Sequence, residues 1–138
     1  MRKNELKAKL KSAWALQKQI ENDYEELQRL RDCANKITPA YSLVPGSGGD
    51  NQKVATAVAK IVDLEKVINA DMARLMTALQ EVRELISLLD DGTQIVVMRM
   101  RYLNYKKWEV IAADLGYSWR QVHRLHGRAL NSILNKCK

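Results

Sequence analysis

The side chains best suited to chemistry lie together near the C-terminus, in a segment that reads as a helix beginning at Trp119. Arg120 and Arg124 are about one helical turn apart, and a guanidinium can donate two hydrogen bonds to the acceptors of guanine. Gln121 carries an amide that suits adenine, and exposure to solvent is an equal alternative for it. These residue types point to recognition of DNA bases, with phosphate contact as the alternative for the arginines.

Two short amphipathic patterns joined at a glycine surround these residues, from Trp108 to Leu125. Gly116 opens the turn, and the hydroxyl of Ser118 can accept a hydrogen bond from an unpaired amide at the start of the next helix. This is the pattern of a helix-turn-helix, in which the cap directs the first residues of the second helix toward a DNA groove. The inward-facing apolar positions are Ile111, Leu115, Val122 and Leu125.

A helix-turn-helix pair needs a third helix to cover its core. The apolar run from Ile95 to Leu103 predicts that helix, and Asp90 and Asp91 can end the preceding helix or cap this one. Gly127 lies inside a predicted helix, where it costs about 1 kcal/mol relative to alanine, so we expect another backbone to approach it closely. Trp119 is expected either to contact a thymine methyl or a sugar, or to close the small core.

Basic charge is concentrated in the same region. Residues 92–138 hold nine Lys and Arg against two Asp and Glu, whereas residues 1–91 hold 14 of each sign. A local excess of this kind is typical of a nucleic-acid-binding surface. We predict double-stranded DNA as the partner and no enzymatic activity. No catalytic residue or cofactor is predicted, because the sequence shows no Ser/His/Asp grouping, paired carboxylates or phosphate-binding glycine loop. No metal site is predicted, because His123 and His126 have no third ligand nearby.

The first 91 residues carry two apolar stripes with coiled-coil spacing, separated by a stretch rich in proline and glycine. Polar residues interrupt the stripes at Gln17, Arg31 and Glu65. We therefore predict an all-α fold: a long antiparallel coiled-coil hairpin over residues 1–91 with a linker at 38–50, followed by a three-helix helix-turn-helix domain at 92–138. The stripes consist of Leu6, Leu10, Ala13, Ile20, Tyr24, Leu27 and Ala34, then Val54, Val58, Ile61, Ile68, Met72, Leu75, Leu79, Val82, Ile86 and Leu89.

Further apolar residues lie beside these stripes and must be covered by something else. A second copy of the chain is the favoured cover, which predicts a homo-oligomer, most simply a dimer on a two-fold DNA site; contact with the chain's own C-terminal domain is the alternative. No membrane-spanning segment or signal peptide is recognised, so a cytoplasmic location is expected. The extra residues are Leu16, Leu30, Val62, Leu64, Val67, Leu85 and Leu88.

The C-terminal region resembles region 4, the promoter-reading domain of bacterial sigma factors. The resemblance covers Val97–Leu103, Trp108–Ala112, Gly116–Ser118 and Val122–Leu130. More closely, the whole chain resembles the small sigma-like regulators of the ArpU and RinA type, which are encoded by phages and prophages of Gram-positive bacteria. The resemblance implies a regulator that activates late phage genes in the cytoplasm of a bacterial host, with RNA polymerase as a second candidate partner.

By this resemblance, the helix from Trp119 enters the major groove, and Trp119, Arg120, Gln121 and Arg124 take base-facing positions. His123 and Arg128 fall where phosphate contacts are expected. Sigma factors usually place Ser or Thr before the position of Trp108, whereas this chain has Lys107, preceded by Lys106. That helix is then capped less well, but the two ammonium groups can bind a phosphate.

Two other functions use similar parts. A small terminase subunit also joins a helix-turn-helix to an oligomerising helical hairpin, but usually carries the DNA-binding part first. A module that binds polymerase or a sigma factor through the hairpin, without reading DNA, is the other alternative. A ring of about eight or more subunits in solution would favour the terminase, and a gel shift on random genomic fragments that recovers no preferred sequence would favour the protein-binding module.

Overall fold

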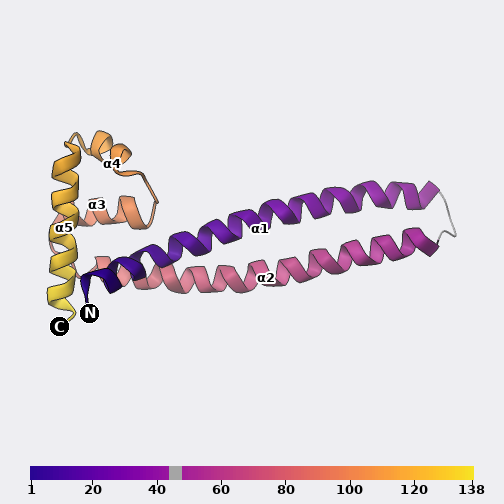
Figure 1. Cartoon of the computed structure of the whole chain (residues 1–138), viewed down its shortest axis with the longest axis horizontal. Coiled ribbons are helices and arrows are strands. Elements are labelled where there is room, and N and C mark those ends of the chain that lie inside the picture. The colour runs from indigo at the N-terminus through magenta and orange to yellow at the C-terminus, as the bar shows by residue number, and fades with distance from the viewer. Residues whose placement is uncertain (44–47) are drawn as a thin grey trace. The chain divides into compact units, whose positions relative to one another are not determined.

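The computed structural model describes the backbone of residues 1–43 and 48–138 and the side chains of residues 1–36 and 52–138. The described residues form five helices and no strand, which confirms the all-α class. None of these helices has the combination of length and apolar character needed to cross a membrane. The helices are α1 (Lys3–Leu43), α2 (Gly48–Ile86), α3 (Gly92–Tyr102), α4 (Trp108–Leu115) and α5 (Trp119–Lys136) (Figure 1).

The two long helices extend further than expected from the proline and glycine content. We predicted a linker over residues 38–50, but α1 continues to Leu43 and α2 begins at Gly48. Proline within a helix removes one backbone hydrogen bond and crowds the carbonyl four residues earlier, and α1 continues for only four residues beyond Pro39; glycine in the first turn of α2 loses no interior bond. Residues 44–47, the rest of the predicted linker, lie outside the described part of the chain.

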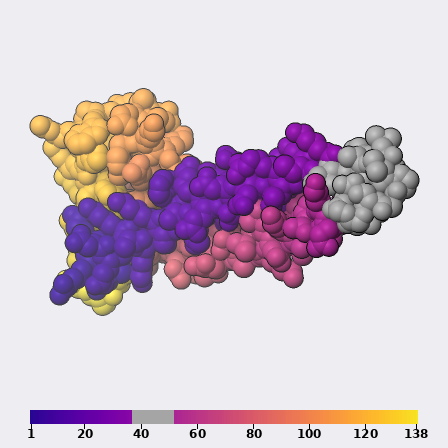
Figure 2. All heavy atoms as spheres, turned by 45° about the vertical axis from the view of Figure 1, so that its right-hand side comes forward, coloured from indigo at the N-terminus to yellow at the C-terminus, as the bar shows by residue number. Residues whose placement is uncertain are grey.

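The chain divides into two compact units at other points than the predicted boundary between residues 91 and 92. One unit comprises residues 1–16 and 75–138, and the other comprises residues 17–74. The reason is packing: Leu10 of α1 and Val82 of α2 are fully buried in the same hydrophobic cluster as Leu130 of α5. Figure 2 shows the indigo beginning of α1 against the yellow end of the chain.

A smaller core joins α3, α4 and α5 within the first unit. Its fully buried members are Val97 of α3, Ile111 of α4 and Val122 of α5. Leu115 and Leu125 pack against it while remaining partly exposed. The four inward-facing positions expected from the sequence therefore all border this core. It positions the beginning of α5, which carries the candidate site.

The apolar residues beside the predicted stripes differ in their surroundings. Leu85 and Leu88 pack against the larger cluster of the first unit, as expected if the C-terminal domain covers them. Val62 and Val67 are exposed, and so are Tyr24, Val58 and Met72, which were assigned to the stripes. Two paired helices bury side chains only along the line where they touch, so the edges of a wide apolar face stay open. Leu16, Leu30 and Leu64 are half-buried.

In the second unit, segments of α1 and α2 run side by side in opposite directions (Figure 1). Two of the polar interruptions of the stripes pair with each other: Arg31 Nη2 lies 3.0 Å from Glu65 Oε1. Both side chains are almost half exposed, so the ion pair adds at most about 1 kcal/mol. Its main effect is to favour one alignment of the two helices, because any sliding separates the charges.

Gly127 is not crowded, in contrast to the expected close approach of another backbone. A Cβ atom placed there meets nothing within 4 Å, and the same is true at Gly116. The two glycines differ in backbone conformation: Gly116 has φ +69°, in the left-handed region, whereas no such angle occurs at Gly127. The sequence pattern correctly placed Gly127 inside a helix, but it gave no information about the open space beside this glycine.

Replacing Gly127 with alanine is therefore expected to raise the free energy of unfolding by about 0.5–1 kcal/mol, because alanine is the better helix former and fits without a clash. Urea denaturation followed by circular dichroism measures this change. The matched control is Gly116→Ala, which is expected to destabilise because of its positive φ. A loss of stability in Gly127→Ala would show that the space is occupied in solution.

Candidate nucleic-acid interface

The beginning of α5 is fixed by a turn and a reciprocal cap. Gly116 donates its amide to the carbonyls of Ala112 and Ala113, which satisfies the end of α4. Ser118 Oγ accepts a hydrogen bond from the backbone N–H of Gln121 at 3.1 Å, and the side-chain oxygen Oε1 of Gln121 accepts one from the backbone N–H of Ser118 at 2.9 Å. This capping box fixes the first turn of the helix.

Ser118→Ala is expected to lower the free energy of unfolding by about 1 kcal/mol, since it removes the acceptor for the Gln121 amide. Thermal and urea denaturation measure the loss. Ser12→Ala serves as the control, because the Ser12 hydroxyl donates to the Lys9 carbonyl within an exposed part of α1 and caps no helix start. Equal, negligible effects of both substitutions would show that the cap does not stabilise α5.

The outer face of α5 presents a row of cations. Arg120, Arg124 and Arg128 are all exposed, and none of them forms an ion pair or hydrogen bond with any described residue. Val122, Ala129 and Leu130 occupy the opposite face and are buried. The guanidinium groups are thus free to bind an external anion or a base edge. The outward orientation of Arg120 and Arg124 is the condition on which the predicted interface depends.

Gln121 lies beside these arginines but has a second role. Its amide oxygen accepts the hydrogen bond from the Ser118 amide, while the –NH₂ group makes no hydrogen bond within the described residues. Recognition of adenine through both amide atoms competes with the cap for that oxygen. Gln121 is therefore better placed to donate one hydrogen bond than to make a paired contact.

Two tryptophans enclose His123. The ring centroid of Trp119 lies 3.9 Å from that of His123, and the Trp108 centroid lies 4.6 Å from it. His123 is half-buried, and its Nε2 atom is buried without a hydrogen-bond partner in the described part of the chain. The imidazole is thus packed between two aromatic rings and is not exposed on the outer face of α5 beside the arginines. Trp119 remains 57% exposed on top of this stack, where it can still reach a ligand.

The two lysines before α4 also differ. Lys106 Nζ lies 3.0 Å from Asp114 Oδ2, so its charge is already paired within the fold. Lys107 occupies the N-cap position of α4 without a side-chain capping bond, as expected from the lack of Ser or Thr there. Lys107 is exposed and has no ion pair among the described residues. Of the two, Lys107 is the better candidate for phosphate contact.

A buried hydrogen bond behind the interface was not anticipated. The hydroxyl of Tyr102 on α3 lies 2.6 Å from Nε2 of His126 on α5. Burial lowers the pKa of His126 to about 4 and raises the pKa of Tyr102 to about 12, so both groups are uncharged near neutral pH and share one hydrogen bond. The sequence held a signal for this burial, since His126 follows Val122 and precedes Leu130 by one helical turn on the apolar face.

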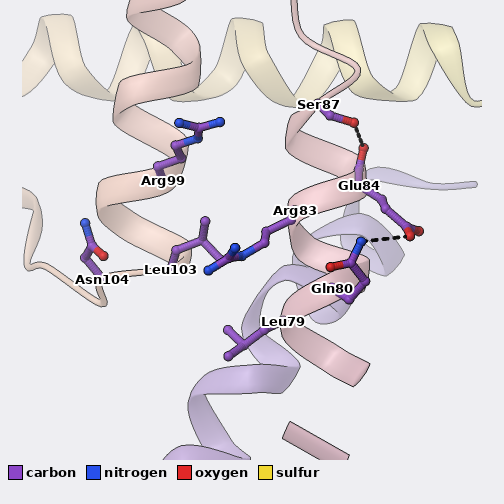
Figure 3. Close-up of a pocket in the computed structure, with 8 residues that line it drawn as sticks. All are labelled: Leu79, Gln80, Arg83, Glu84, Ser87, Arg99, Leu103 and Asn104. Carbon is purple, nitrogen blue, oxygen red and sulfur yellow. Dashed lines mark hydrogen bonds between the residues drawn. The ribbon is translucent and has the colours of Figure 1, made fainter. Parts of the chain in front are cut away.

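A separate groove between α2 and α3 is lined by two more arginines (Figure 3). It has a volume of about 610 Å³, with Leu79 and Leu103 among its apolar residues and Arg83 and Arg99 among its polar ones. Glu84 accepts a hydrogen bond from Gln80 at 3.2 Å. The lining of this groove includes no residue of α5, so it is not part of the interface described above.

No known family matches the chain, and neither the curated proteins nor the solved structures compared with it are similar to it.

Proposed function

We propose that this protein is a sequence-specific DNA-binding regulator of transcription, in which α4, the turn at Gly116 and α5 act as a helix-turn-helix. In this proposal α5 enters the major groove of duplex DNA. The observation that carries it is the row of free, exposed guanidinium groups at Arg120, Arg124 and Arg128 on a capped helix. Arginine can read guanine through two parallel hydrogen bonds, which discriminates by about 1–3 kcal/mol against a wrong base.

Position along the helix separates two roles for these cations. Arg120 and Arg124 lie in the first two turns of α5, nearest the N-terminal end that a recognition helix directs at base edges. Arg128 lies one turn further on, where phosphate contact is favoured. Lys107, at the start of α4, supplies a further unpaired charge for the backbone. Arg120 and Arg124 are therefore assigned to reading bases, and Arg128 and Lys107 to binding the phosphate backbone.

The test compares binding to a duplex selected from a random pool with binding to a scrambled duplex, by fluorescence anisotropy at several salt concentrations. Arg120→Ala and Arg124→Ala are expected to reduce the preference for the selected duplex by about 1–3 kcal/mol each. Lys107→Ala, the matched loss of one charge, should weaken both duplexes alike and lower the salt slope by about 0.9. Uniform loss on both duplexes from every variant would contradict the assigned roles.

The regulatory part of the proposal rests on the resemblance to sigma-like phage regulators, in which the DNA-reading part acts on late genes. RNA polymerase and a second copy of the chain are the proposed protein partners. If two copies bind together, the selected DNA has two-fold symmetry, with half-sites about 10 base pairs apart or a multiple of that distance. A reporter gene behind the selected site then shows whether transcription rises or falls.

A further inference from the structure

A pocket that the proposed recognition face does not use lies within the first unit, between α1, α3, α4 and α5. Its volume is about 190 Å³. Sites for drug-sized molecules usually measure about 300–1,000 Å³, so this pocket suits a smaller group. The lining contains three cationic side chains and no carboxylate; its members are Lys7, Lys11, Arg101, Tyr102, Trp108, His123 and His126.

Arg101 is held in place at one wall of the pocket. Its Nη1 donates to the carbonyl of Lys106 at 3.0 Å, and its guanidinium carbon lies 4.6 Å from the ring centre of Trp108. These contacts fix the group without neutralising it, because neither partner is an anion. An arginine held in this way loses little side-chain entropy when it binds a ligand.

The two lysines add unpaired charge to this fixed group. Lys7 and Lys11 lie one turn apart on α1, and neither forms an ion pair with a described residue. The pKa of His126, which also lines the pocket, is lowered first by burial and then by the nearby cations Lys7 and Arg101. Like charges gathered in a partly enclosed space repel one another, and a bound anion would relieve that repulsion.

Two buried polar atoms near the pocket also have no partner among the described residues. One is Nε2 of His123, a residue that lines the pocket. The other is the hydroxyl of Tyr105, in an adjoining hollow of about 60 Å³ that shares Lys11, Arg101 and Tyr102. Buried polar groups are normally hydrogen-bonded, so unpaired ones indicate that a polar ligand or water belongs nearby.

We propose that this pocket binds a phosphate group, and that the group is supplied by the backbone of bound DNA. The three cations give a phosphate its charge and hydrogen-bond partners, and the small volume excludes a whole nucleotide. The DNA source rests on the proposed function, and it extends the DNA-contacting surface from the C-terminal domain to the beginning of α1. A free phosphate ion has the same chemistry, so the experiment has two arms.

The first arm uses inorganic phosphate and the full-length chain without DNA. Nitrogen-15 NMR follows the indole N–H of Trp108, which lines the pocket, and the backbone N–H of Val62, on α2 in the second unit, as an internal reference. Phosphate is expected to shift the Trp108 signal with saturation, whereas sodium chloride of equal ionic strength does not. The double variant Lys7→Ala/Lys11→Ala should abolish the saturable shift. This arm needs no assumption about DNA.

The second arm measures the salt dependence of binding to a scrambled duplex. Loss of Lys7 and Lys11 is expected to lower the slope of log K against log salt by about 0.9, the value for the one phosphate that the pocket holds. The matched control is Lys9→Ala/Lys36→Ala, which removes the same charge from exposed lysines of α1 that do not line the pocket. The control slope should change clearly less.

The outcomes distinguish a DNA phosphate from a free phosphate ion, and they distinguish failure of the pocket proposal from failure of the proposed DNA-binding function. A selective loss of slope supports a DNA phosphate in the pocket, whatever the result with inorganic phosphate. A saturable phosphate shift without a selective loss of slope overturns the DNA source and assigns the pocket to a free phosphate group. Absence of both overturns the pocket. If the wild-type chain binds no DNA, the proposed function fails, and the phosphate titration alone decides whether the pocket is a site.

Discussion

Replacing Leu10 with alanine is expected to lower the free energy of unfolding by about 2–5 kcal/mol, the range found when a buried leucine is truncated. Leu10 has no solvent exposure, and it belongs to the cluster that also contains Ile86, Met98 and Leu130. The residue is far from the C-terminal domain in sequence, but it contributes to the core behind α5. Urea denaturation measures the loss in chains that carry Trp14→Phe, so that tryptophan fluorescence reports on Trp108 and Trp119 alone.

Met76→Ala is the control for this substitution. Met76 is 72% exposed on α2, so its truncation should change stability by no more than about 0.5 kcal/mol. The fluorescence transition of Leu10→Ala should move together with the loss of helix, because α1 and α5 share one core. A loss below about 1 kcal/mol, or an unchanged fluorescence transition, would show that the beginning of α1 is not part of that core.

Acidification is expected to destabilise the protein through His126. The pKa of this imidazole is lowered from 6.5 to about 4 by burial, so the folded protein keeps it neutral in a range where the unfolded chain binds a proton. The contribution is complete above pH 6.5 and is lost as the pH falls toward 4. The free energy of unfolding should drop by up to about 3 kcal/mol over this interval.

His126→Gln isolates this effect from other titrating groups. The glutamine amide does not titrate and can accept a hydrogen bond from the Tyr102 hydroxyl. Urea denaturation at a series of pH values should show a clearly smaller decline in the variant between pH 6.5 and 4. NMR titration of the His126 ring in the wild-type chain gives its pKa directly. An ordinary pKa near 6.5, or identical declines in both proteins, would contradict the buried, neutral imidazole.

Much of the helical structure could be predicted because it depends on local patterns. The glycine at 116, the cap at Ser118 and the apolar spacing around Ile111 and Val122 each act within a few residues. Asp91 likewise caps α3 by accepting from the amides of Thr93 and Gln94. Such features are encoded by neighbours in sequence, and the structure has them where they were expected.

The features that were missed depend on residues far apart in the chain. The larger core joins Leu6 and Leu10 to Ile133, and periodicity gives no information about which distant helix covers an apolar face. The pairing of Lys106 with Asp114 and the packing of His123 between two tryptophans also arise only after folding. For that reason the candidate site was predicted as a set of residues, while the surroundings of several members were not.

The proposed role of the α5 arginines is tested by parallel selection from a random DNA pool, with the wild-type chain and with the double variant Arg120→Ala/Arg124→Ala. High-throughput sequencing after several rounds gives the enriched sequences. The wild type is expected to select a defined motif, with guanine at the positions that the variant no longer selects. Recovery of the same motif by both proteins, or of no motif by a folded wild-type chain, would contradict the claim that the exposed arginines of α5 read DNA.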